Sequence, residues 1–173
     1  MIKWNDAIGK ALEKISNRNM YAYFYGAKGE FLDTATMKRL WDAEPVFYSK
    51  FSPKDKEEIF LNSYGKIGYD CSGFVGSFIG DMTYSAAQAS HCTRNESPRL
   101  GPAGSLLYTT FGGSGRHIAI DIGYGYFINM SNMSTDEAVK AGRDSIWIGK
   151  ISEFPWEFSG KHQNIDYEGA TNR

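Results

Sequence analysis

The chain has 173 residues, of which 42% are hydrophobic and 15% aromatic, enough for one domain with a substantial core and too few for two. Its 19 basic and 20 acidic residues leave a net charge of −1, which argues against a nucleic acid as the main partner. No apolar run approaches the roughly 20 residues needed to span a bilayer, and the N-terminal segment lacks the apolar core of a signal peptide. We therefore expect a soluble protein that is made in the cytoplasm without a signal peptide.

Helical patterns dominate the first half of the chain. Apolar residues recur there at i, i+3 and i+4 spacing, which places them on one face of each helix. One of these helices begins with Ser52, Pro53 and Asp55, the arrangement of an N-cap with a capping box. An aromatic run at residues 20–26 is interpreted as a strand face or the edge of a cleft. The expected helices cover residues 4–16, 34–43, 53–61, 71–82 and 85–91.

The hydrophobic period changes to two in the second half of the chain. Four strands separated by glycine-rich turns are expected at residues 105–111, 116–122, 126–130 and 145–151. A capping box at residues 134–137 predicts one more short helix. From residue 157 onward the chain turns polar without periodicity. Helices followed by a meander of strands predict an α+β fold.

Cys71 stands at the start of a predicted helix whose apolar face carries Phe74 and Phe78. A helix N-terminus offers free N–H groups and the positive end of the helix dipole, which stabilise a thiolate. The neighbouring Ser72 and Gly73 are small and leave room for a substrate backbone. The alternative interpretation is a buried cysteine that acts as a small hydrophobe. The position beside polar residues, away from the phenylalanine face, favours a nucleophile.

His117 opens a predicted strand in which it shares one face with Ala119, while the isoleucines share the other. The small Ala119 should let this face press close against a helix. A turn through residues 123–125 pairs Ala119 with Asn129, which makes Asn129 a neighbour of His117 able to accept a hydrogen bond. A buried asparagine in an apolar strand needs such a partner. Thiol, imidazole and amide match a nucleophile, its base and the group that orients the base.

These residues resemble the motifs of NlpC-type papain-like cysteine peptidases. Asp-Cys-Ser-Gly-Phe-Val at 70–75 is similar to the nucleophile motif of that family, and residues 117–129 are similar to its histidine strand, glycine hairpin and third polar residue. Residues 23–27 resemble its upstream Tyr-x-Trp-Gly-Gly segment, with tyrosine for tryptophan and alanine for the second glycine. Residues 102–106 are a looser match to its Pro-Gly-Asp-Leu strand entry.

The resemblance implies a papain-like core, with helices packed on a central antiparallel sheet and the nucleophile at a helix N-terminus. It implies hydrolysis of peptidoglycan stem peptides, usually between D-γ-glutamyl and a diamino acid. Cys71 is then the nucleophile, His117 the base and Asn129 the orienting residue. No cofactor or metal is implied, and we expect the enzyme to be a monomer.

The resemblance also suggests residues that contact the substrate. The Tyr23 hydroxyl is expected near the oxyanion, and Asp70 near the amino side of the substrate. Ser72, next to the nucleophile, is also expected among the oxyanion- and substrate-binding residues, and we interpret it as a helix-start residue rather than a second nucleophile.

A long connection at residues 28–66 joins the aromatic run to the cysteine helix. The family usually has a shorter one, so we interpret this segment as a helical insertion in a single catalytic domain of residues 1–160. Its apolar side chains must be buried, and we expect it to dock as ordered helices that form one wall of the substrate groove. Lys38 and Arg39 should then influence which stem peptide is cut. Residues 161–173 are expected to be a polar tail that would suit a linker to a wall-binding module.

Other functions could use the same residues. An N-acetylmuramoyl-L-alanine amidase would cut between muramic acid and L-alanine, and the short gap from His117 to Asn129 favours the endopeptidase over it. A papain-like acyltransferase would call for a basic or membrane-seeking surface, which the sequence does not indicate. A non-catalytic binding module would not need the Cys-His-Asn set. A phage-type endolysin that reaches the bacterial cell wall after release and a cytosolic recycling peptidase both remain open.

The remaining cysteine and histidines receive no catalytic role. His91 and Cys92 adjoin a helix and are neighbours in sequence, so their side chains point about 100° apart and cannot form a nucleophile–base pair. A zinc site built from these two with Cys71 and His117 lacks a short ligand spacing such as Cys-x-x-Cys, so we expect no metal. His162 falls in the polar tail, where we expect it to be solvated.

Overall fold

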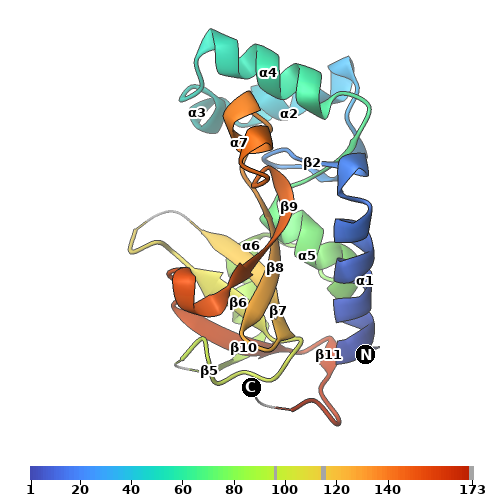
Figure 1. Ribbon diagram of the computed structural model, residues 1–173, viewed down its shortest axis with the longest axis vertical. Helices are drawn as coiled ribbons and strands as arrows, with labels where there is room; N and C mark the ends of the chain where they lie inside the picture. Colours follow the sequence, from blue (N-terminus) through green and yellow to red (C-terminus); the bar gives the residue numbers. More distant parts are fainter. Residues whose placement is uncertain (96, 114–115, 172–173) are drawn as a thin grey trace.

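The computed structural model describes residues 1–95, 97–113 and 116–171 (Figure 1). Within these ranges a six-stranded sheet contains β5 (Cys92–Asn95), β6 (Leu106–Thr109), β7 (His117–Gly123), β8 (Tyr126–Ser131), β9 (Ser145–Lys150) and β10 (Phe158–His162). The spatial order is β5-β10-β6-β7-β8-β9, and each neighbouring pair is antiparallel. The predicted α+β fold with a central antiparallel sheet is confirmed.

The catalytic candidate Cys71 opens a helix that packs directly on this sheet. This helix, α5 (Cys71–Ile79), contacts β7 and β8, and α1 (Trp4–Ser16) packs against α5 (Figure 1). The short helix α6 (Ser85–Ser90) contacts β6, β7 and β10. Helix α5 ends before Gly80, whose φ of 70° suits a residue without Cβ, so the predicted extension to Met82 is wrong. In the described part of the chain, no helix is both long enough and apolar enough to cross a membrane.

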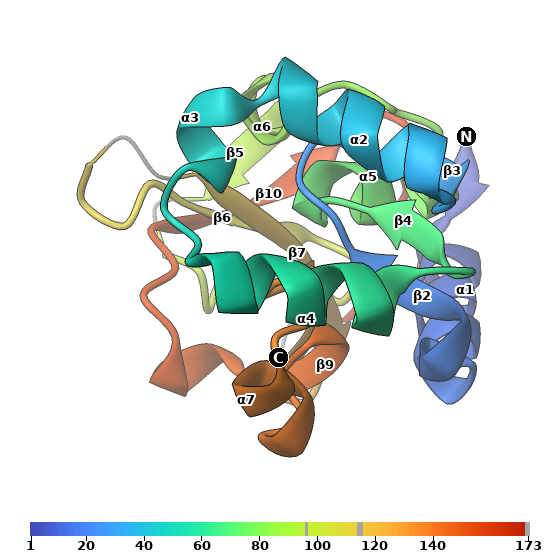
Figure 2. The same ribbon diagram turned by 90° about the horizontal axis from the view of Figure 1, so that it is seen from above.

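The segment 28–66 is ordered, but it begins with a strand. Strands β2 (Tyr21–Tyr23), β3 (Lys28–Phe31) and β4 (Ile67–Tyr69) form a small sheet in the order β2-β4-β3, so only the first part of the aromatic run is a strand. Helices α2 (Thr34–Ala43), α3 (Pro45–Tyr48) and α4 (Pro53–Ser63) follow β3, with the predicted capping box at Ser52 and Asp55. Figure 2 shows them from above, with α4 beside α7 (Asp136–Lys140).

Hydrogen bonds connect the insertion to the rest of the domain. The side-chain amide of Asn62 in α4 donates to the carbonyl oxygen of Ser134 at 2.9 Å, and the backbone N–H of Asp136 donates to Glu58 at 3.0 Å. Thr135, rather than Ser134, is the N-cap of α7, because its hydroxyl accepts from the backbone of Ala138. The insertion is therefore docked, as expected.

The two faces of β7 pack against different parts of the protein, and the helix lies on the face opposite to the predicted one. The isoleucine face, with Ile118 and Ile120, belongs to the large core that also holds Phe74 of α5. Ala119 belongs to a smaller cluster with Trp156, on the opposite face of the strand. The prediction that the Ala119 face presses against a helix is therefore wrong. The small side chain makes room for a large indole instead.

Residues 161–166, predicted to lie in a polar tail, are part of the folded domain, whereas residues 172–173 of that predicted tail lie outside the described residues. Strand β10 lies inside the central sheet between β5 and β6, and β11 (Ile165–Asp166) pairs in parallel with β1 (Ile2–Lys3). His162 is only 1% exposed. The strand lacks an apolar pattern because it contains Gly160, where a Cβ would come within 2.5 Å of the Cβ of Cys92. Close strand packing at this position therefore uses a residue that sequence patterns assign to loops.

Candidate active site

Cys71 is the first residue of α5, and the residue before it caps the helix. The backbone N–H of Gly73 donates to Oδ1 of Asp70 at 2.6 Å, so Asp70 is the N-cap. The thiol is free, and 7% of the surface of Cys71 is exposed. The residue thus lies at the positive end of the helix dipole, as expected, but it is largely shielded from water.

His117 and Asn129 meet across the β7–β8 pair. The register places Asn129 opposite Ala119, as predicted. The connection itself differs from the prediction, because residues 124–125 form a two-residue turn and a bulge at Ile122 supplies the extra residue. Nε2 of His117 lies 2.8 Å from Oδ1 of Asn129.

Asn129 determines which nitrogen of the imidazole carries the hydrogen. Its Nδ2 donates to the carbonyl oxygen of Trp147 at 3.3 Å, so its Oδ1 faces His117 as the acceptor. Nε2 of His117 therefore donates, and in the neutral ring Nδ1 keeps its lone pair. Among the described residues, no hydrogen bond of this Nδ1 is found. This is the tautomer of a base that accepts a proton through Nδ1.

Aromatic rings enclose the imidazole of His117. Trp156 stacks on it with a centroid separation of 5.6 Å and 14° between the planes. Phe154 and Phe111 lie at centroid distances of 5.9 and 6.2 Å. Burial lowers the pKa of His117 to about 4, against the opposing effect of its hydrogen bond with Asn129.

The thiol of Cys71 is also uncharged at rest. Burial raises its pKa to about 12, and the nearby Asp70 carboxylate acts in the same direction. The backbone N–H of Ile118 and the Lys28 ammonium oppose this rise. At neutral pH the Cys71 thiol and the His117 imidazole are therefore both uncharged, and Cys71 is not the thiolate that the helix dipole alone would favour.

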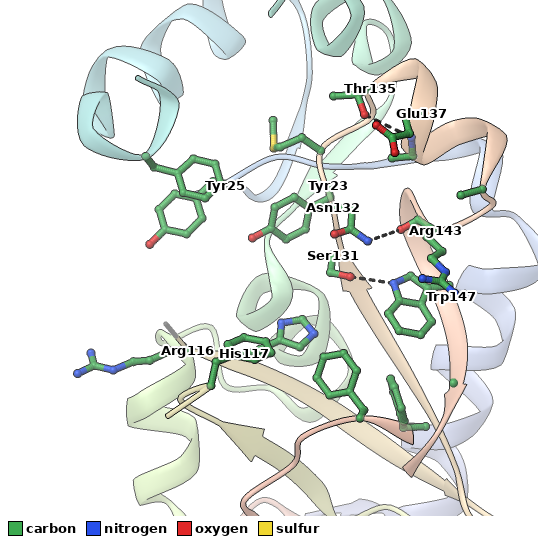
Figure 3. A pocket seen from close by; sticks show the side chains of 18 of the residues that line it. Tyr23, Tyr25, Arg116, His117, Ser131, Asn132, Thr135, Glu137, Arg143 and Trp147 are labelled. Atoms are coloured by element: carbon green, nitrogen blue, oxygen red, sulfur yellow. Dashed lines mark hydrogen bonds between the residues drawn. The ribbon is translucent and has the colours of Figure 1, made fainter. Parts of the chain in front are cut away.

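Tyr23 lies beside the same helix end, on β2. Burial raises the pKa of its hydroxyl well above the usual value, and the next contributions come from Cys71 and Asp70. Both residues are therefore close to the Tyr23 side chain. Figure 3 shows Tyr23 and His117 at the same cavity, contributed by different elements.

Asp70 and Ser72 form a network with Lys28, a residue that sequence patterns did not single out. Nζ of Lys28 lies 2.8 and 3.0 Å from the two carboxylate oxygens of Asp70 and also donates to the Ser72 hydroxyl. The Ser72 hydroxyl donates to Asp70 at 2.9 Å. Neither Asp70 nor Ser72 lines the large cavity. Their role in substrate binding stays a prediction.

A cavity of about 1050 Å³ opens beside His117 and Tyr23 (Figure 3). The insertion contributes Phe47, Lys50 and Phe51 to its lining, so this segment forms one wall of the cavity. That this cavity is the substrate groove stays a prediction. Helix α7 and strands β8 and β9 form the opposite side. From there the cavity is lined by Ser131, Asn132, Met133, Thr135, Glu137, Ala138, Ala141, Arg143, Trp147, Gly149 and Lys150.

Not every expected residue of the insertion reaches this cavity. Lys38 and Arg39 are absent from its lining and form exposed ion pairs with Asp42 and Glu30. The aromatic side chains that do line it come from the short helix α3 and the turn after it, which lack the length for a clear helical period. The sequence therefore indicated which segment lies at the cavity, but not which residues of that segment line it.

A second cluster of ionisable side chains lies away from the cavity. Oδ2 of Asp81 accepts from Nδ1 of His91 at 2.7 Å and from Nε2 of His162 at 3.0 Å. We call these three residues the Asp81 cluster. Thr83 donates to the other oxygen through its backbone N–H and its hydroxyl, at 3.1 and 2.6 Å. Burial alone would raise the pKa of Asp81, but these hydrogen bonds hold it well below its usual value.

The possible ligand atoms of the Asp81 cluster lie within 4.8 Å of one another, a spacing that a metal ion could use. A histidine that binds a metal normally donates a hydrogen bond from its other nitrogen. Nδ1 of His162 does the reverse, because it accepts from the backbone N–H of Asn164 at 3.2 Å. The arrangement therefore fits a neutral His162 that donates to Asp81, and it does not fit a metal centre.

Comparisons with known proteins bear on the fold. The structure is similar to the crystal structure of the NlpC/p60 domain of the peptidoglycan hydrolase SagA, with a TM-score of 0.53 and 20% sequence identity. The match covers 92% of this chain and 99% of that chain. No protein-family model matches the chain, and no curated protein matches it in sequence. The papain-like NlpC/p60 fold that the motifs predicted is therefore the fold of this protein.

Proposed function

We propose that this chain is a cysteine peptidase that hydrolyses the stem peptides of bacterial peptidoglycan. The observation that carries the proposal is the 2.8 Å hydrogen bond between His117 and Asn129, beside a helix that begins at Cys71. Similarity to the fold of a peptidoglycan hydrolase domain supports the substrate class. The bond we propose is that between D-γ-glutamyl and a diamino acid.

The chemistry begins from an uncharged pair. The Sγ–H proton of Cys71 passes to Nδ1 of His117 as Sγ attacks the carbonyl carbon of the scissile amide. The C–N bond then breaks while the imidazolium returns this proton to the leaving amine, which leaves a thioester on Cys71. Water then attacks the thioester with His117 as base, and the proton returns to Sγ as the carboxylic acid product departs. Asn129 holds the ring and stabilises the transient imidazolium.

Two kinds of donor would stabilise the tetrahedral oxyanion. Free backbone N–H groups at the start of α5 point toward the end of the helix where Cys71 stands. The Tyr23 hydroxyl stays protonated because burial raises its pKa, so it can donate a hydrogen bond. We propose that both act on the oxyanion.

The cavity is the proposed binding groove for the stem peptide. Its volume of about 1050 Å³, lined by the insertion and by the α7 side, is large enough to hold a segment of peptide. Four basic side chains line it, from Lys50, Arg116, Arg143 and Lys150, against two acidic ones, from Glu137 and Glu153. This excess of basic side chains suits a peptide that carries free carboxylates.

The direct test is digestion of purified peptidoglycan of known composition, followed by mass identification of the fragments. The proposal expects new amine ends on the diamino acid and none in the Cys71→Ala protein. New amine ends on L-alanine would instead assign an N-acetylmuramoyl-L-alanine amidase. Intact walls after incubation with wild-type protein would refute the proposal.

We further propose that the enzyme acts on the bacterial cell wall as an endolysin. Addition of the purified protein to bacteria with exposed walls should lower the turbidity of the suspension, whereas the Cys71→Ala protein should not. Cleavage of isolated stem peptides without lysis would favour a recycling peptidase.

A further inference from the structure

Lys28 is the first residue of β3, and its side chain reaches across to the start of α5. Its ammonium contacts both carboxylate oxygens of Asp70 and the Ser72 hydroxyl, the side chains immediately before and after Cys71. The Lys28 side chain is 30% exposed and that of Asp70 is 11% exposed. A pair this sheltered is screened less by solvent than a surface ion pair.

The backbone around Lys28 is also fitted to the helix. The backbone N–H of Asp70 donates to the carbonyl oxygen of Ala27 at 2.9 Å. A Cβ on Gly73 would come within 2.7 Å of that same oxygen and within 3.2 Å of Cα of Lys28. A glycine at this position therefore allows β3 to lie directly on the first turn of α5. Backbone packing between β3 and α5 therefore holds Lys28 next to Asp70.

The charge that Lys28 balances is the one next to the thiol. The Asp70 carboxylate caps the helix by accepting a hydrogen bond from the backbone N–H of Gly73. Its negative charge, however, opposes formation of a thiolate at Cys71. Lys28 is the cation that opposes this effect. The other ionisable groups near the thiol are Tyr23 from β2, Tyr25 just after it and Tyr108 from β6, and all three are uncharged at neutral pH because burial raises the pKa of each hydroxyl.

We propose that Lys28 is a positioning residue that neutralises the capping carboxylate of Asp70, so that the cap holds the helix start without suppressing ionisation of Cys71. The proposal rests on Cys71 as the nucleophile of the proposed function. It adds that a residue of the insertion, outside the Cys-His-Asn set, adjusts the reactivity of the thiol.

The test measures the rate of alkylation of Cys71 by iodoacetamide as a function of pH, in a Cys92→Ser background so that one thiol reacts. Lys28→Met should move the profile upward by about one pH unit, which slows alkylation about ten-fold at a fixed neutral pH. Lys28→Arg, which keeps the charge, should leave the profile near that of the parent. The double variant Lys28→Met/Asp70→Asn removes both charges and keeps a capping side chain, so it should return the profile toward the parent.

Arg18→Met is the matched control. Arg18 pairs with Asp144 at 3.2 Å, with side chains 35% and 12% exposed, values close to those of the Lys28–Asp70 pair. Its loss should lower the thermal unfolding midpoint about as much as Lys28→Met without moving the alkylation profile. An unchanged profile in Lys28→Met, or a double variant shifted as far as Lys28→Met, would overturn the proposal. Because alkylation needs no peptidoglycan, a wrong substrate assignment would leave this result intact.

Discussion

Two places in the described part of the chain have a cysteine, a histidine and a polar side chain on neighbouring elements. The first is the proposed catalytic set, in which Cys71 opens α5, and α5 contacts the strands of His117 and Asn129. The second pairs Cys92 on β5 with His162 on β10, and His162 donates to Asp81. In both places burial raises the pKa of the thiol to about 12. Residue types and burial therefore do not separate the two.

The two places differ in the free nitrogen of the imidazole. His162 uses both nitrogens, since Nε2 donates to Asp81 and Nδ1 accepts from Asn164. Cys92 likewise donates its hydrogen to the carbonyl oxygen of Gln88 at 3.3 Å. His117 uses only Nε2 among the described contacts and lines a cavity. A histidine whose hydrogen bonds are complete holds elements together, whereas one with a free lone pair beside a cavity can accept a proton.

The largest expected effect separates the two thiols. Cys71→Ala should abolish hydrolysis of peptidoglycan, because no other group there can form the thioester. Cys92→Ser should retain most activity, because the hydroxyl can still donate to the Gln88 carbonyl. Dye-release assays on labelled walls measure both, with circular dichroism to verify folding. Equal loss in both variants would mean that the second place also takes part in catalysis.

The next effect compares the histidines. His117→Ala should lower turnover by about 10²–10⁴-fold, as is typical for loss of a general base. His162→Ala should leave the turnover of the folded fraction near that of wild type and lower the unfolding midpoint instead. Rates normalised to the folded fraction at each temperature make the comparison. A fully folded His162→Ala protein without activity would contradict the structural role of that histidine.

Asn129 should have an intermediate effect. Asn129→Ala leaves the buried Nε2–H of His117 without its acceptor, which costs about 1–3 kcal/mol. If this cost appears in the transition state, kcat falls roughly 5- to 150-fold. Asn129→His should retain part of the activity, because an imidazole nitrogen can also accept from Nε2–H. Wild-type kcat in Asn129→Ala would show that Asn129 does not orient the base.

The Asp81 cluster should determine how stability responds to acid. The pKa of Asp81 is lowered in the folded state, so its stabilising effect is present above its unfolded pKa and is lost as pH falls through the lower folded value. Burial lowers the pKa of His162 as well, so protonation below pH ~6.5 favours the unfolded chain. Urea unfolding at several pH values should show stability falling from near neutral pH toward acid. Asp81→Asn should flatten this slope, and an unchanged slope would exclude the cluster as its source.

The smallest effect is a shift of the acid limb of activity. His117 accepts a proton only when neutral, and burial lowers its pKa to about 4, so kcat/KM should fall as pH drops through that value. An unperturbed histidine would place the limb near ~6.5. Rates from short assays, divided by the folded fraction at each pH, separate this fall in kcat/KM from unfolding of the protein caused by titration of the Asp81 cluster. A limb at the unperturbed value would mean that the imidazole is solvated in the working enzyme.

The sequence by itself determined the local elements and the neighbourhood of His117 and Asn129. Helix periods, the capping box at Ser52 and Asp55 and the alternation along β7 depend on residues close in the chain, so patterns reveal them. The register between the strands of His117 and Asn129 was predicted from the hairpin that joins them, and the structure confirms it. A bulge in β7, rather than a three-residue turn, produces this register.

Only the tertiary structure decided the contacts between residues distant in sequence. Strand β10 was not predicted because it contains Gly160 and Ser159, whose small size matters only against the neighbouring strand. Lys28 meets Asp70 across 42 positions, and Asp81 meets His162 across 81. No periodicity encodes such a meeting, because it depends on how sheet and helices pack. Among the described residues, the same packing leaves Nδ1 of His117 without a hydrogen bond beside a cavity, while both nitrogens of His162 are hydrogen-bonded.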